Sequence, residues 1–285
     1  MTLARPTAGS DLDPKKSPLA PLLALGRPIV MGVLNVTPDS FSDGGRFLDP
    51  AAAIEQARRL AAEGADILDI GAESSRPYGG AGAVPVEEEL RRLAAVLPAA
   101  AALGLPISID TMKSKVAAWA LASGAAIVND VWGLQRDSDL ARVVAQHAAP
   151  VVIMHNRAAA DPSIDIMADI AAFFSRSLEI AGRAGIAREN IVLDPGIGFG
   201  KTPEQSLVAI ARLAELKSFG LPLLVGASRK RFIDKVSPAP PDRRLGGSIA
   251  AHLLAVAGGA AIIRTHDVAE TTQALRVAAA IGSAR

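Results

Sequence analysis

Polar side chains follow the short apolar runs of this sequence, at the position where each run ends. Solvent begins where a buried strand ends, which explains one or two such residues. It does not explain a set so rich in aspartate, asparagine and histidine, so we predict that these residues surround a functional site. The set is Asn35, Glu73, Asp110, Asn129, Asp130, His155, Asp194, Ser228, His266 and Asp267.

Three members of this set suggest what the site binds. The carboxylates of Asp110 and Asp194 can each accept paired N–H groups, as they would from a guanidinium fork. The edge of a 2-amino-4-oxo pyrimidine offers the same paired donors, and the amide of Asn129 supplies a donor and an acceptor beside it. Asp110 by itself fits equally well as a helix cap, since Thr111 and a helical segment follow it. For the three residues together, ligand binding is the better interpretation.

A second candidate group is basic and predicts an anion site. The segment 228–244 carries a net charge of +4 and leads into Gly246-Gly247-Ser248 at the start of a predicted helix. The next apolar run contributes Arg264 and His266. Barrels often bind phosphate after strands 7 and 8, and a helix N-terminus adds N–H donors. A solvated basic loop is the alternative, and it fits Lys235, Arg243 and Arg244 better than Lys230 and Arg264.

The segment 195–202 reads PGIGFGKT, which departs by one residue from a phosphate-binding P-loop because Pro195 stands where glycine is needed. We interpret its glycines as allowing the backbone to approach a flat ligand, with Phe199 packing near it. His155 fits a ligand-binding role and a hydrogen-bonded strand-end role equally well. His147 and His252 lie in helical segments, where core or surface roles are expected.

The elements that must position these residues alternate along the chain. Runs that are apolar throughout are typical of strands buried on both faces, and Ala/Leu/Arg-rich segments between them are typical of helices. A repeat of about 30 residues favours one (β/α)8 TIM barrel over a doubly wound sheet. Long connections, at 36–50 and 74–85, follow strands 1 and 2, where functional loops are expected. The predicted strands are 29–35, 67–73, 106–110, 127–130, 151–155, 191–194, 223–228 and 262–267; the predicted helices are 51–63, 86–102, 113–123, 138–147, 164–184, 203–217, 247–256 and 268–281.

Composition bounds the class of protein. Of 285 residues, 50% are hydrophobic and 21% charged, with a net charge of +1, which supports a large core and argues against a dedicated nucleic-acid-binding protein. The absence of cysteine excludes disulfides, thiolate nucleophiles and Cys-ligated metals. Residues 1–27 lack the order of parts of a signal peptide, and no apolar run is long enough to span a membrane. We therefore expect a flexible tail over 1–27, a barrel over 28–285 and a cytoplasmic location.

Seven motifs, taken in order, resemble the signatures of the dihydropteroate synthase family. The resemblance covers the chain from about Pro28 to the C-terminus. The motifs are MGVLNVTPDSFSDGGRF at 31–47, ADILDIGAESSRP at 65–77, SIDT at 108–111, VNDV at 128–131, DPGIGFGK at 194–201, GASRK at 226–230 and RTHD at 264–267.

The resemblance implies a dimeric (β/α)8 barrel, a sulfonamide target, that uses Mg²⁺ to join 6-hydroxymethyl-7,8-dihydropterin diphosphate to p-aminobenzoate. It implies a role in pterin binding for Asp110, Asn129, Asp194, Phe199 and Lys230, and in diphosphate binding for Asn35, Arg264 and His266, with Asn35 acting through Mg²⁺. Asp43, Ser75, Arg76 and Lys230 would be catalytic, and the p-aminobenzoate pocket would contain Ser75, Arg76, Pro77, Phe199, Lys230 and Arg231.

Two positions depart from the family pattern. Ser75 stands where many members have threonine, and Arg231 stands where many have a serine that contacts the p-aminobenzoate carboxylate. Two other classes remain as alternatives: a pterin-binding paralogue without synthase activity, and a methyltransferase of the same barrel superfamily. The presence of Asn35, Asp43 and Arg76 argues against the first, and the first and last motifs argue against the second.

Overall fold

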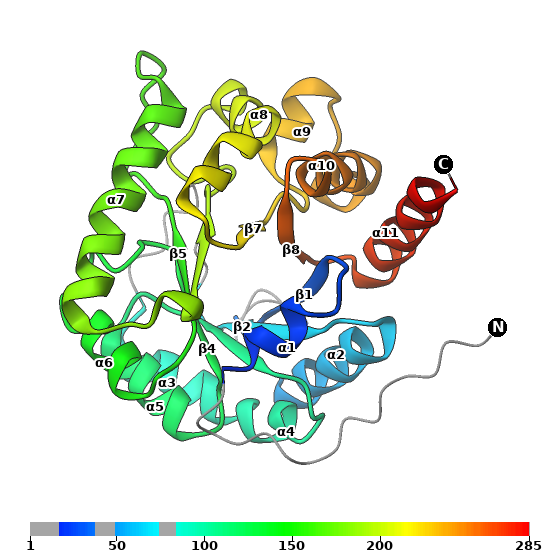
Figure 1. Ribbon diagram of the computed structural model, residues 1–285. Coiled ribbons are helices and arrows are strands. Elements are labelled where there is room, and N and C mark those ends of the chain that lie inside the picture. The colour runs from blue at the N-terminus through cyan, green and yellow to red at the C-terminus, as the bar shows by residue number, and fades with distance from the viewer. Residues whose placement is uncertain (1–16, 38–48, 74–83, 285) are drawn as a thin grey trace.

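The computed structural model describes residues 17–37, 49–73 and 84–284, and in it eight parallel strands close into a barrel, each strand pairing with its neighbours in chain order (Figure 1). Nearly all strand residues are buried, which is why the strands appear as unbroken apolar runs. The prediction of a (β/α)8 barrel is confirmed. The strands are β1 (Ile29–Asn35), β2 (Ile67–Gly71), β3 (Ile107–Asp110), β4 (Ile127–Asp130), β5 (Val151–Met154), β6 (Ile191–Asp194), β7 (Leu223–Val225) and β8 (Ala260–Thr265).

Helices surround the barrel, and those after β2 differ from the predicted pattern in three places. The predicted helix 86–102 is two helices, because Pro98 has no N–H to donate to the carbonyl of Ala94, where the first one ends. The predicted helix 203–217 changes to a 3₁₀ turn after Ala211. A short helix, α9, lies inside the predicted basic loop. The helices are α1 (Leu19–Leu23), α2 (Pro50–Glu63), α3 (Val86–Ala94), α4 (Leu97–Ala101), α5 (Ser114–Ala122), α6 (Leu140–Gln146), α7 (Ile166–Ala184), α8 (Pro203–Ala211), α9 (Arg231–Val236), α10 (Leu245–Ala257) and α11 (Val268–Ser283).

Helix α1 covers the end of the barrel where the strands begin (Figure 1). Leu19 is buried and joins the apolar cluster formed by the first residues of the strands, among them Ile29, Met31 and Leu224. The prediction of a flexible tail was therefore wrong for α1, because its leucines cover apolar strand ends that would otherwise contact water. Residues 1–16 lie outside the described residues.

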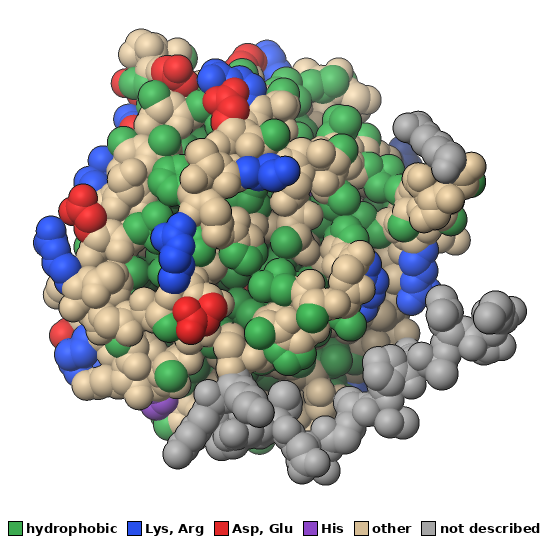
Figure 2. All heavy atoms as spheres, viewed as in Figure 1, with side chains coloured by type: hydrophobic (Ala, Val, Ile, Leu, Met, Phe, Trp, Pro, Cys, Tyr) green, Lys and Arg blue, Asp and Glu red, His purple; other side chains and the backbone are tan. Residues whose placement is uncertain are grey.

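The face of the molecule at this end carries Lys and Arg side chains interspersed with Asp and Glu, with hydrophobic side chains between them (Figure 2). Among the residues that the structure describes, no helix has both the length and the apolar character needed to cross a membrane. The predicted site lies at the opposite end, where the strands finish, because all eight strands run parallel.

Candidate active site

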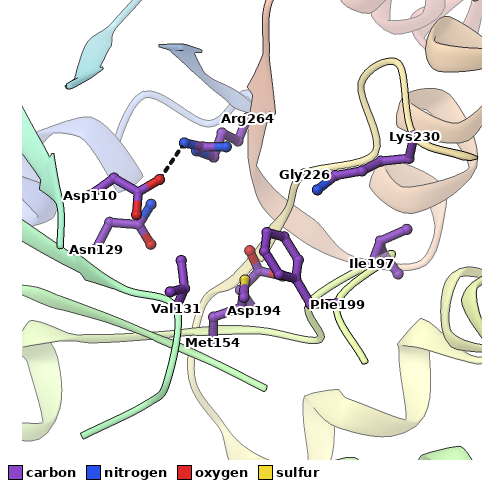
Figure 3. A pocket seen from close by; sticks show the side chains of 10 residues that line it. All are labelled: Asp110, Asn129, Val131, Met154, Asp194, Ile197, Phe199, Gly226, Lys230 and Arg264. Atoms are coloured by element: carbon purple, nitrogen blue, oxygen red, sulfur yellow. Dashed lines mark hydrogen bonds and ion pairs between the residues drawn. The ribbon is translucent and has the colours of Figure 1, made fainter. Parts of the chain in front are cut away.

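A pocket opens at the end of the barrel where the strands finish, and candidate residues from five strands or the loops after them meet in it (Figure 3). The register of the sheet explains part of this convergence: Asp110 of β3 lies beside Asn129 of β4, and Asp194 of β6 lies beside Met154 of β5. The pocket is lined by Asp110, Asn129, Val131, Met154, Asp194, Ile197, Phe199, Gly226, Lys230 and Arg264.

The three residues predicted to bind a paired-donor edge are all buried at this pocket. Asp194 uses Oδ1 to accept a hydrogen bond of 2.7 Å from the backbone N–H of Gly196. Asp110 uses Oδ2 to accept one of 2.8 Å from Nη2 of Arg264. The helix-cap alternative for Asp110 was wrong, because α5 begins only at Ser114 and the Asp110 carboxylate binds the arginine instead.

An aspartate that the sequence analysis missed holds two of these residues in place. Asp69, fully buried in β2, accepts hydrogen bonds from Nε of Arg264 at 2.6 Å and from Nδ2 of Asn129 at 3.1 Å. Arg264 is thus held by two carboxylates, those of Asp69 and Asp110. The available signal was a charged residue in the middle of the apolar run ILDIG, where a charge is expected only if it is paired.

Burial changes the protonation of the acidic groups. Burial raises the pKa of Asp110 to about 7; the charge of Arg264 opposes this rise and that of Asp69 adds to it. Burial likewise raises the pKa of Asp194 to about 6, against the hydrogen bond from Gly196. For Arg264 burial would lower the pKa, but Asp69 and Asp110 outweigh it and the pKa is raised, so the guanidinium is charged. A ligand that donates N–H groups to the carboxylates would favour their charged forms.

A flat surface forms the opposite side of the pocket. The ammonium of Lys230 lies 4.0 Å from the centre of the Phe199 ring, a cation–π arrangement. Phe199 packs in a small apolar cluster with Val131 and Met154. In Figure 3 the Lys230 side chain reaches toward the ring from the right, while Asp110, Asn129 and Arg264 lie across the pocket. Phe199 and Lys230 therefore line the same pocket as Asp110, Asn129 and Asp194.

The glycines of segment 195–202 have a different role from the one predicted. All three have positive φ: 66° at Gly196, 79° at Gly198 and 52° at Gly200. A Cβ at Gly196 would overlap the carbonyl oxygen of His155, and one at Gly200 would overlap Arg157. The predicted approach to a ligand was therefore wrong for Gly196 and Gly200, which allow close packing against the chain after β5.

The residues predicted to bind diphosphate lie on neighbouring strands β1 and β8 or just after them. His266 contacts Ser228 Oγ with Nδ1 at 3.0 Å, and burial lowers the pKa of His266 to about 3, so the ring is neutral. Asn35 ends β1, and its amide makes no hydrogen bond to another of the described residues. Arg264 lines the pocket beside Asp110, and so joins the two predicted groups of residues.

Two arginines of the basic segment bind other groups of the protein. Arg229 pairs with Asp267. Arg244, predicted to be solvated, is 8% exposed and donates to the carbonyl oxygens of Ala239 at 2.7 Å and Arg229 at 3.1 Å, so that expectation was wrong. Gly247 at the start of α10 serves packing, since a Cβ there would overlap Ile233, whereas a Cβ at Gly246 would meet no atom within 4 Å.

The remaining predicted residues are not among those that line the described pocket. Asp43, Ser75, Arg76 and Pro77 fall outside the described residues. Arg231 is exposed at the start of α9 and does not line the pocket. Three of the remaining strand-end residues bind neighbouring groups of the fold. Glu73 accepts hydrogen bonds from Lys113 and Val84, and Asp130 accepts them from Trp132 and Leu134. His155 contacts Lys201 and Asp169. His147 is exposed and His252 is buried.

Comparison with known proteins identifies relatives of this chain. Residues 31–266 match the family model described as "Pterin binding enzyme". The chain is 44% identical to dihydropteroate synthase of Synechocystis sp. over 90% of each protein. A structure of the Xanthomonas albilineans synthase with 4-aminobenzoic acid superposes with a TM-score of 0.86 at 46% identity, covering 90% of this chain and 94% of that one. Another, in complex with 7,8-dihydropteroate, superposes with a TM-score of 0.82 at 43% identity over the same shares.

Proposed function

This chain belongs to the family of pterin binding enzymes, and on that premise we propose that it acts as a dihydropteroate synthase. The enzyme is a transferase of folate biosynthesis. It joins 6-hydroxymethyl-7,8-dihydropterin diphosphate to p-aminobenzoate and releases 7,8-dihydropteroate and diphosphate.

One observation carries this proposal: Asp110, Asn129 and Asp194 meet in one pocket that Phe199 and Lys230 also line. The 2-amino-4-oxo edge of a pterin donates N–H groups, which two carboxylates and an amide accept. The flat ring of the pterin lies against Phe199, and Lys230 adds a donor at the rim. A pocket of this kind suits a flat, hydrogen-bonding heterocycle better than an apolar ligand.

The reaction is a displacement at carbon. The bond between the pterin methylene carbon and the diphosphate oxygen breaks, the amine nitrogen of p-aminobenzoate bonds to that carbon, and the amine proton leaves to solvent. An SN1-like path fits, because the pterin ring stabilises a neighbouring cation. Arg264 stabilises the negative charge that builds on the leaving group: its Nη1 makes no hydrogen bond to the described residues and remains available. The arylamine mainly needs to be positioned.

We propose that Mg²⁺ binds with the diphosphate and that Asn35 is its protein ligand. The amide oxygen of Asn35 fits, because Mg²⁺ keeps several waters and takes few protein oxygens when phosphates supply the rest. Bound Mg²⁺ would neutralise charge on the leaving diphosphate. In the part of the chain that the structure describes, no group of three or more His, Asp or Glu residues forms a separate metal site.

We propose that the chain forms a homodimer through α8, α10 and α11, which lie along one flank of the barrel (Figure 1). These helices expose Leu207, Leu254, Val277 and Ile281. Exposed apolar side chains on adjoining helices favour association. Leu254→Glu should convert a dimer to a monomer in sedimentation velocity, whereas Leu25→Glu, at an exposed leucine after α1, should not. A wild-type monomer at micromolar concentration would reject the dimer.

The function is tested by product formation. Purified protein is mixed with p-aminobenzoate, the pterin diphosphate and Mg²⁺, and 7,8-dihydropteroate is measured by chromatography. Product that disappears with EDTA and returns with added Mg²⁺ supports both the reaction and the metal. Product that is unaffected by EDTA refutes the metal alone. Tight binding of the pterin diphosphate without product favours a non-catalytic paralogue. Sulfonamide inhibition and the expected cytoplasmic location are tested by adding the drug to the same assay and by fractionating cells.

A further inference from the structure

Lys201 is a buried lysine next to the pocket, and the proposed reaction does not use it. Its side chain is 2% exposed. Its ammonium donates to the carbonyl oxygen of Gly196 at 2.9 Å, to that of Phe199 at 3.2 Å and to Nδ1 of His155 at 2.6 Å. An ammonium has three N–H groups, so each has an acceptor. Two of the three acceptors belong to the loop that follows Asp194.

The acceptor ring is itself held in one orientation. Since Nδ1 of His155 accepts from Lys201, the ring proton resides on Nε2, which donates to Oδ2 of Asp169 at 2.9 Å. Asp169 also pairs with Arg157 at 2.9 Å. Burial lowers the pKa of His155 to about 3, which keeps the ring neutral. A chain of contacts therefore runs from Lys201 through His155 to Asp169 on helix α7.

The loop that Lys201 holds follows a path that depends on its glycines. Gly196, Gly198 and Gly200 all adopt positive φ, and Gly196 is in close contact with the carbonyl of His155. Between these glycines stands Phe199, whose ring lies under the ammonium of Lys230. The position of the ring therefore depends on the contacts that fix the backbone around it.

We propose that Lys201 is a positioning residue of the pterin site: its buried ammonium binds the carbonyl oxygens of Gly196 and Phe199 and so fixes the loop that presents the Phe199 ring to the ligand. The proposal rests on the proposed function for the identity of the ligand. The effect of Lys201 on the loop does not depend on the proposed function, because it is measurable in the ligand-free protein.

The charge of Lys201 gives this role a dependence on pH. A neutral amine has two N–H groups, so one of the three contacts would be lost on deprotonation, and its lone pair would face an acceptor. Burial lowers the pKa of Lys201 to about 7, while Asp194 and Asp169 oppose this effect. Below that pH the loop should be held by all three contacts, and above it by fewer. The ionisable groups that face Lys201 are His155, Arg157, Asp169, Asp194 and Lys230.

The test compares Lys201→Met, which keeps most of the volume and removes the donors, with Lys115→Met at an exposed lysine of α5. The dissociation constant for the pterin diphosphate is measured by calorimetry from pH 6 to pH 9. Because hydrogen bonds from a charged donor are lost, Lys201→Met should bind about 10-fold to 100-fold more weakly at pH 6. The ratio to wild type should shrink by pH 9, where the wild-type lysine is neutral. Lys115→Met should bind as wild type.

A second readout needs no ligand. Trp132 packs against the cluster of Val131, Met154 and Phe199, so its fluorescence reports on the position of the ring. The emission of the free wild type should change near neutral pH, where Lys201, Asp110 and Asp194 all titrate, and Lys201→Met should reduce that change. Trp132→Phe identifies the contribution of the other tryptophan, Trp119.

The possible outcomes distinguish a failure of the positioning role of Lys201 from a failure of the proposed synthase activity. Equal affinity of Lys201→Met and wild type, or a ratio that does not change with pH, overturns the positioning role even if the enzyme makes product. A wild type that makes no product, while the Trp132 transition is present and depends on Lys201, refutes the function and leaves the loop role supported. If Lys201→Met does not fold, Asp169→Asn replaces it: a shift of the Trp132 transition supports the proposal, and an unchanged transition refutes it.

Discussion

Replacing Asp69 by asparagine should destabilise the protein, because Asp69 forms a buried ion pair. The substitution keeps the shape of the side chain and removes its charge. Nε of Arg264, 2.6 Å from Asp69, then loses a charged partner in a site where Arg264 is only 15% exposed and Asp69 not at all. Breaking a buried pair costs about 3–5 kcal/mol. Asp110 still binds Nη2 of Arg264 at 2.8 Å, so we expect a loss of about 2–4 kcal/mol in the free energy of unfolding.

The chain offers a matched control for this substitution. Glu215 pairs with Nε of Arg212 at 2.7 Å, nearly the same distance, but the two side chains are 52% and 46% exposed. Solvent and side-chain entropy cancel most of the energy of such a pair. Glu215→Gln should therefore leave the free energy of unfolding unchanged within error, although the chemical change is the same.

The assay is urea denaturation of both variants and the wild type, followed by circular dichroism at pH 7.5. Asp69→Asn should also raise KM for the pterin diphosphate about tenfold, because Arg264 loses one of the two contacts that orient it. Equal losses for both variants, or a loss below about 1 kcal/mol for Asp69→Asn, would contradict the argument that burial makes this pair important.

Three further predictions follow from the site. Asp194→Asn should weaken pterin binding about 10-fold to 100-fold in calorimetry, because an amide cannot accept both N–H groups; wild-type affinity would remove Asp194 from the pterin site. The same variant should be more stable than wild type at high pH. Burial raises the pKa of Asp194 from 3.8 to about 6, so the stability of the wild type falls by up to about 3 kcal/mol as the pH rises between these values. Urea denaturation at pH 4 and pH 8 should therefore show a difference between the variant and the wild type only at pH 8. Gly200→Ala should cost at least about 2 kcal/mol in thermal or urea unfolding, because of its positive φ and its overlap with Arg157. Gly182→Ala, in an open position on α7, should instead gain about 0.5–1 kcal/mol, and similar signs for the two would refute the reasoning.

Much of the candidate site was predictable because it lies at strand ends. Parallel strands buried on both faces leave a clear pattern, an apolar run that stops at a polar residue, and in a barrel all such ends meet at one rim. Asp110, Asn129 and Asp194 follow this pattern, and the structure brings them together. The strand bounds 29–35, 127–130 and 191–194 were predicted as observed, since the apolar run and the hydrogen-bonded strand coincide there.

Residues whose role depends on a distant partner were not predictable. Asp69 is separated from Arg264 by 195 positions, and only closure of the barrel places them 2.6 Å apart. Lys201 belongs to a glycine motif that resembles a ligand-binding loop, and only the packing of that loop against the end of β5 shows that its ammonium is enclosed by carbonyl oxygens and His155. Arg244, assigned to a solvated loop, is buried because it binds the carbonyl oxygens of Ala239 and Arg229 and pairs with Asp234 of α9.

The amino-acid sequence by itself determined the (β/α)8 fold, the family and the strand-end residues that line the pocket, because each depends on local hydrophobic pattern and on motifs in order. The tertiary structure decided which charges are paired, which lysine is buried and which acids have raised pKa values. These properties depend on burial and on contacts between strands and loops that are far apart in the chain. The energy of a charged group is set by this three-dimensional environment and not by its neighbours in sequence.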